Sequence, residues 1–139
     1  MAFTGNYTCN SFKSGLLSGD FDFDTPGDTI KMALYTNSAT LDADTAAYTT
    51  TGEVSAIDSG YTAGGVTLTV EKGLSNNTAY ISFADATISA AITARGALIY
   101  KDGGAAICVL DFGSDKTSTA TFTVTFPTAS SADALIRLS

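Results

Sequence analysis

A chain of 139 residues suits one ordinary domain spanning residues 1–139, with a core large enough to fold without a metal or a disulfide. Only 15% of the residues are charged, and 14 acidic against 7 basic residues give a net charge of −7. This charge repels phosphate backbones and anionic membrane surfaces, so we expect no nucleic acid and no membrane as partner.

The predicted elements begin with one short helix. Phe12, Leu16 and Leu17 recur at helical spacing behind a capping residue at position 10 or 11, and Ser18-Gly19 is a stop signal. The N-terminus has no basic stretch followed by an apolar one, and no segment approaches the roughly 18 apolar residues of a membrane span. We therefore expect a chain made in the cytosol without a leader.

Four aspartates follow within the stretch SGDFDFDTPGD, in the run Asp20–Asp28. A calcium-binding EF-hand loop that begins at the first of them would need glycine at Thr25 and glutamate at Lys31, so this motif fails at two demanding positions. The alternation DFDFD instead predicts a strand with Phe21 and Phe23 toward the core and the aspartates toward water, before a turn at TPGD. A weak calcium site that relieves the repulsion among the carboxylates is the alternative.

From residue 29 the apolar residues recur with a period of two, which is typical of strands. In TIKMALYT, residues Ile30, Met32 and Leu34 form one apolar face, and this pattern predicts a half-buried strand. ARGALIYK and AAICVLDF are apolar on both faces and are separated by Asp102-Gly103-Gly104, so they predict a central hairpin.

Further strands are predicted where every second residue is apolar. These apolar faces are Val66, Leu68 and Val70; Ala79, Ile81 and Phe83; Phe122, Val124 and Phe126, with Thr121, Thr123 and Thr125 outward; and Ile136 with Leu138. Between the strands, Thr40 to Gly60 shows no sustained period and predicts a long surface excursion with one helical turn around residues 43–48. A loop of this length in a compact domain is often functional. The fold class predicted is all-β: a single antiparallel β-sandwich or barrel-like domain of about seven strands with one short N-terminal helix.

Histidine and tryptophan are absent, which removes the commonest general base and metal ligand and any Ser-His or Cys-His nucleophilic pair. Paired carboxylates of a glycosidase would need a platform of aromatic side chains, but the tyrosines and phenylalanines mostly fall on predicted core faces. The sequence therefore predicts no enzyme, and we assign no catalytic, cofactor-binding or metal-binding residue.

Two further pairs of residues have architectural interpretations. Cys9 and Cys108 lie far apart and form no CxxC motif, so we expect two reduced structural cysteines, with a disulfide as the alternative. Arg95 and Asp111 each lie in or at the end of a strongly apolar strand, and the central hairpin would bring them together as an ion pair. We interpret this pair as part of the architecture rather than a functional site.

The ordered phrases IKMALYT, GYTAGG, ARGALIY and VLDFGSDK resemble those of a family of small virion structural proteins of tailed bacteriophages. The resemblance covers most of the chain from Phe3 to Ser139. It implies a protein made in the bacterial cytoplasm and incorporated into the virion in many copies, without a cofactor. The first hypothesis is a capsid decoration, or cement, protein that binds the outside of the head as a homotrimer and braces subunits of the major capsid protein.

A second hypothesis is a tail, neck or fibre-associated structural protein that binds carbohydrate on the host surface. A secreted carbohydrate-binding module is disfavoured, because the chain has no tryptophan and no signal peptide. The best candidates for partner contacts are Ala2 to Leu17 and Thr40 to Gly60, since both carry apolar residues outside the sheet pattern. The alternative for both segments is ordinary packing over the open ends of a sandwich.

Overall fold

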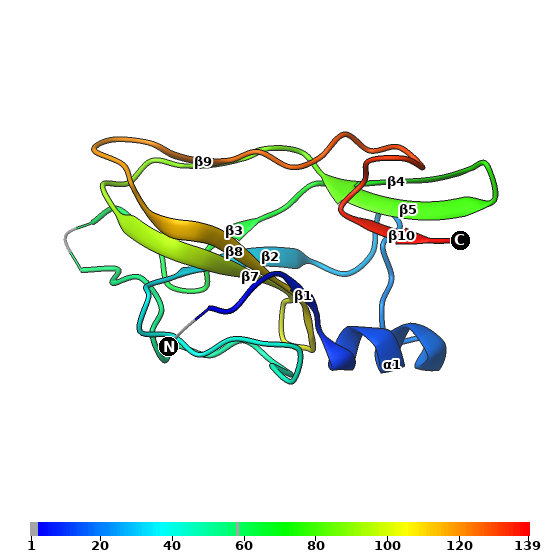
Figure 1. Cartoon of the computed structure of the whole chain (residues 1–139), viewed down its shortest axis with the longest axis horizontal. Coiled ribbons are helices and arrows are strands. Elements are labelled where there is room, and N and C mark those ends of the chain that lie inside the picture. Colours follow the sequence, from blue (N-terminus) through cyan, green and yellow to red (C-terminus); the bar gives the residue numbers. More distant parts are fainter. Residues whose placement is uncertain (1–2, 58) are drawn as a thin grey trace.

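The computed structural model describes residues 3–57 and 59–139 and is built mostly of antiparallel strands (Figure 1). Strands make up 40% of the chain and helix 7%, which confirms the all-β prediction. The described residues form ten strands rather than about seven, because several short pairings of two or three residues complete the sheets. The elements are β1 (Tyr7–Thr8), α1 (Asn10–Ser18), β2 (Ile30–Tyr35), β3 (Val66–Thr67), β4 (Val70–Ser75), β5 (Thr78–Phe83), β6 (Ala86–Ile88), β7 (Thr93–Lys101), β8 (Ala106–Thr117), β9 (Phe122–Val124) and β10 (Ile136–Leu138).

The strands form three sheets, with the orders β1-β8-β7-β2-β3, β10-β5-β4 and β6-β9. The predicted central hairpin is confirmed, since β7 and β8 pair antiparallel on either side of the turn at 102–104. Gly103 in this turn has a φ of 75°, a left-handed conformation that glycine adopts without a steric penalty. None of the helices in the described part of the chain is long and apolar enough to cross a membrane.

The middle of the five-stranded sheet, formed by β2, β7 and the first part of β8, is buried on both faces. Met32 lies opposite Ile99, and both belong to the larger core cluster, which includes the inward residues of β6 and β9. On the other face Ala33 lies opposite Leu98, in a second cluster covered by the N-terminal segment and by residues 39–41. In Figure 1 the two covering layers lie above and below the sheet.

The prediction that β2 is half-buried is therefore wrong, because Ala33 and Tyr35 on its second face are fully buried. The residues around 43–48 form no helical turn either. Two isolated bridges hold the excursion instead, one between Ala47 and Ala105 and one between Tyr35 and Glu53. A segment without its own period is thus shaped by the sheet on which it packs.

Helix α1 is confirmed, although the residue before it is Cys9 and no side chain caps its first turn. It ends at Gly19, which has a φ of 75°. Phe12 is buried and Leu16 is half-buried, whereas the Leu17 side chain is 92% exposed. Leu17 follows Phe12 by five residues, which places it about 140° around the helix and away from the core.

Candidate binding surfaces

The aspartate run forms an irregular loop rather than the predicted strand, and its own side chains close it. The Asp22 N–H donates to Asp28 Oδ2 at 2.7 Å, and the Asp24 N–H donates to Asp22 Oδ1 at 2.9 Å. Lys72 Nζ lies 2.7 Å from Asp24 Oδ1, and Lys101 Nζ lies 3.2 Å from Asp28 Oδ2. Two lysines thus offset part of the repulsion that a cation would relieve. In residues 3–57 and 59–139 no group of three or more His, Cys, Asp or Glu side chains is arranged to hold a metal.

The two phenylalanines of this loop do pack inward, as the alternation predicts. Phe21 and Phe23 stack with ring centroids 5.9 Å apart, and both meet the ring of Phe12 edge-on. Hydrogen bonds to the aspartate side chains take the place of a strand ladder. The phenylalanines therefore lie inward and the aspartates outward although no strand forms.

The ion pair between Arg95 and Asp111 is confirmed. Arg95 Nε lies 3.0 Å from Asp111 Oδ1, which also accepts the Gly113 N–H at 2.8 Å. Burial alone would raise the pKa of Asp111, but these hydrogen bonds and the guanidinium charge outweigh it and hold the pKa below its ordinary value. The pairing of β7 and β8 is interrupted between residues 111 and 116, so the ion pair fixes one end of a bulge.

Both cysteines are free and buried, which confirms the prediction of structural thiols. They belong to different core clusters, Cys9 to the one under the excursion and Cys108 to the larger one. Burial is the main cause that raises the pKa of Cys9 to about 11, and burial also raises the pKa of Cys108. Neither thiol is activated as a nucleophile.

A carboxylate hub organises the excursion, and sequence patterns did not reveal it. Glu53 Oε1 accepts hydrogen bonds from the Tyr61 hydroxyl and the Gly64 N–H, each at 2.7 Å, and Oε2 accepts one from the Tyr48 hydroxyl at 2.6 Å. The Leu34 N–H on β2 donates to the Tyr61 hydroxyl at 2.9 Å. Burial first, and the carboxylate next to them, raise the pKa of both tyrosines, so they stay protonated donors. Every group of the hub is paired, so its role is to hold the excursion to the sheet.

The phrase GYTAGG supplies the loop that receives this hub. The Tyr100 hydroxyl donates to the Gly64 carbonyl at 2.6 Å, and the Tyr100 ring stacks on Tyr48 with centroids 4.9 Å apart. A side chain at Gly65 would collide with the Met32 carbonyl, so only glycine allows the loop to approach β2 this closely.

The two predicted contact segments mostly build the core. Among their buried residues are Phe3, Cys9, Phe12, Leu41 and Val54. Ala2 and Asp58 lie outside the described residues. Among the described residues of the two segments, only Leu17 and Ile57 are large, apolar and highly exposed, with Ile57 at 79%. Packing over the sheet therefore accounts for most of the apolar residues in both segments.

An apolar groove of about 360 Å³ opens between α1 and the sheet β10-β5-β4. We call this surface the apolar end and define it by the lining residues Leu16, Leu74, Ile81, Ile136 and Leu138. Leu74 is 76% exposed and Leu138 57%. Register explains the surface, since Leu74 lies opposite Ala79, and Ala79 lies opposite Leu138. This face of the sheet extends beyond the core and leaves its outer leucines in water.

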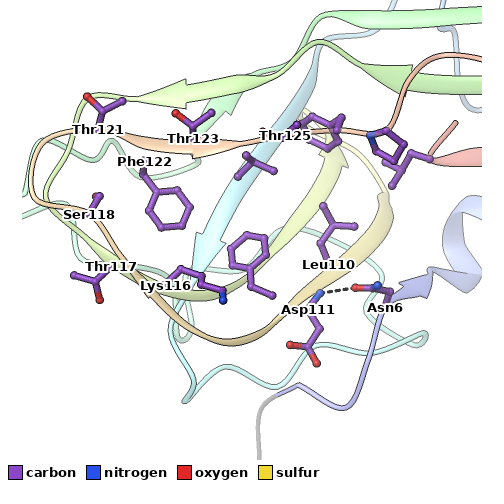
Figure 2. A pocket seen from close by; sticks show the side chains of 15 residues that line it. Asn6, Leu110, Asp111, Lys116, Thr117, Ser118, Thr121, Phe122, Thr123 and Thr125 are labelled. Carbon is purple, nitrogen blue, oxygen red and sulfur yellow. Dashed lines mark hydrogen bonds between the residues drawn. The ribbon is translucent and has the colours of Figure 1, made fainter. Parts of the chain in front are cut away.

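A second groove, of about 610 Å³, lies between the end of β8 and β9 (Figure 2). We call it the edge groove. Its apolar wall is formed by Leu110, Phe112, Phe122 and Leu135, and Lys116 also lines it. These apolar residues fall on predicted strand faces, but the sequence did not reveal that a groove lies between the strands.

Comparison of the chain with protein-family models, curated proteins and solved structures found no match in any of the three. The resemblance to phage virion proteins therefore stays a prediction from the sequence. Three of its four phrases lie in β2, β7 and β8 of the central sheet, and the fourth is the loop at residues 60–65 that approaches β2.

Proposed function

We propose that this chain is a structural protein of a tailed-bacteriophage virion, that it decorates the outer surface of the capsid, and that it braces neighbouring subunits of the major capsid protein. The observation that carries the proposal is the apolar end. Contiguous exposed apolar side chains on a small domain mark an interaction surface. Leu74 and Leu138 thus suit a protein that works while bound to a larger assembly.

The rest of the molecule supports a bracing role. The middle of its central sheet is buried on both faces, and the carboxylate hub ties the longest irregular segment to that sheet. A stiff domain of this kind transmits load between the subunits it contacts. Assembly as a homotrimer on the shell would combine several weak contacts into strong attachment through multivalency. No cofactor is part of the proposal.

The deciding experiment measures copy number and binding on phage particles. Purified virions should contain the chain in numbers comparable with the major capsid protein, and heads that lack it should release DNA at lower temperature. Added protein should bind those heads and restore their stability. A few copies at one vertex, with head stability unchanged by their loss, would assign the chain to the tail, neck or fibre instead.

The same assay tests the apolar end directly. The double variant Leu74→Ser and Leu138→Ser should fail to bind heads, because the contact loses most of its apolar area. Ile57→Ser is the matched control, since it removes an equally exposed apolar side chain from a different segment and should bind normally. If the double variant binds as well as the unaltered protein, the apolar end is not the capsid contact.

A further inference from the structure

Strand β9 has one paired edge and one open edge. The Phe126 N–H donates to Asp85 Oδ1 at 3.0 Å, which shows that the main-chain groups of Phe126 point toward the β6 side. Main-chain groups alternate direction along a strand, so those of Phe122 and Val124 also point to β6, and those of Thr121, Thr123 and Thr125 point away from it. β9 pairs with β6 alone, and within residues 3–57 and 59–139 no hydrogen bond outside the strand ladders reaches the main-chain N–H or C=O of these three threonines.

This open edge borders the edge groove. All three threonines line the groove, and Figure 2 shows the Thr121 and Thr123 side chains on the far side of the strand from it. What they present to the groove is therefore main chain. Its volume of about 610 Å³ falls within the range of about 300–1,000 Å³ that is usual for ligand clefts.

The wall of the groove is apolar. Phe112 and Phe122 meet with ring centroids 6.0 Å apart, and Leu110 and Leu135 are only partly buried. A row of unpaired main-chain groups beside apolar side chains matches one class of ligand, an extended peptide. Such a segment pairs its own main chain with the strand edge and turns alternate side chains into the groove.

The charge of Lys116 further restricts which segments can bind. Lys116 runs along the groove with its ammonium group free of any ion pair in the described residues (Figure 2). The Asp111 carboxylate is instead paired with Arg95. An acidic side chain on the incoming segment would complement Lys116. A second copy of this chain offers no such strand through β9, because residues 119–126 contain no acidic residue and Phe122 and Val124 are already buried.

We propose that the edge groove binds an extended segment of another protein, which adds to β9 as a strand, packs alternate apolar side chains on Phe112 and Phe122, and places a carboxylate next to Lys116. This goes beyond the proposed function and does not rest on it. If the protein does not bind capsids, the proposal for the edge groove still stands. If the edge groove binds no peptide, the proposed capsid role still stands.

The test uses a set of heptapeptides with blocked termini. Each has Val, Ile or Phe at positions 2, 4 and 6, one Glu at position 1 or position 7, and Thr at the remaining positions. A second set carries Lys in place of Glu. With millimolar peptide, NMR hydrogen exchange should show new protection at the amides of Thr121, Thr123 and Thr125. The Glu set should bind more tightly than the Lys set by about threefold, as expected for one exposed ion pair.

Two variants make the test specific. Thr123→Pro removes an outward N–H and should abolish binding, whereas Thr87→Pro should not, since Thr87 is the directly opposed and equally exposed residue on β6. Lys116→Glu leaves the fold intact and should reverse the preference to the Lys set. The proposal is overturned by any of three results: no protection at the three amides with any peptide, equal loss of binding in Thr87→Pro, or an unchanged preference in Lys116→Glu.

Discussion

The two faces of the central sheet are covered in different ways. One face lies under the N-terminal segment and residues 39–48 of the irregular excursion, and Glu53 gathers the hydrogen bonds that hold the excursion to the sheet. The other lies under the regular strands β6 and β9, which are paired with each other but leave the outer edge of β9 free. A loop satisfies its main chain through side chains, whereas a strand needs another strand on each side.

The difference has a functional meaning. The loop-covered face has its polar groups paired through Glu53, which suits rigidity and leaves few unpaired main-chain groups for a partner. The strand-covered face ends in unpaired main-chain groups beside an apolar wall. Such an edge can pair with a further strand and is therefore a binding surface. In this molecule the long loop is therefore the less suited of the two regions to bind a partner, although long loops usually carry the function of a protein.

The largest expected effect comes from breaking the carboxylate hub of the loop-covered face. Glu53→Ala removes the acceptor of three hydrogen bonds and leaves buried donors unpaired, so the free energy of unfolding should fall by about 3 kcal/mol in urea denaturation. Glu71→Ala is the matched control, because Glu71 is the only other glutamate and is exposed on β4. Its effect should stay within about 0.5 kcal/mol.

Thiol labelling locates this effect. The hub contacts both clusters, through Tyr48 the one that holds Cys9 and through Tyr61 the one that holds Cys108. Because β6 and β9 still cover the second cluster when residues 39–48 loosen, Glu53→Ala should speed the labelling of Cys9 more than that of Cys108. If the labelling rates of Cys9 and Cys108 rise equally, the two faces of the sheet open together. The two faces would then differ in structure but not in their opening.

A smaller effect is expected at the bulge beside the edge groove. The pKa of Asp111 in the folded state lies below its ordinary value of 3.8, so its ion pair stabilises the fold above that pH and is lost as the pH falls through the folded-state pKa. Asp111→Asn should therefore lower the free energy of unfolding by about 1 kcal/mol at neutral pH and by less in acid. Asp115→Asn, on the same strand but outside this ion pair, is the matched control and should change the free energy of unfolding at neutral pH by less.

The smallest effect concerns the aspartate loop, which closes on itself as the excursion does. Because Lys72 and Lys101 already contact its carboxylates, millimolar calcium should change the melting temperature by little, and a chelator should change nothing. A rise of several degrees that chelation reverses would show that the loop is a calcium site after all.

By itself the sequence determined those elements whose signal is local. The alternation in TATFTVTF buries Phe122, Val124 and Phe126 and exposes the threonines between them, because a period of two places alternate side chains on opposite faces of any strand. The central hairpin followed from two apolar segments around a glycine turn. The contact between Arg95 and Asp111 followed from that hairpin, since pairing about the turn brings the two strands together.

Only the tertiary structure decided the rest, because it depends on which segments meet. Ala33 and Tyr35 are buried by a loop that has no period of its own, and Glu53 joins two tyrosines and a glycine that share no local pattern. The run DFDFD has the polarity of a strand but no neighbour to pair with, so its aspartates bond their own main chain. The residues of β9 likewise do not indicate that one of its edges is open. Whether a strand is paired on one side or both is set by the arrangement of sheets, and alternation of side chains is the same in either case.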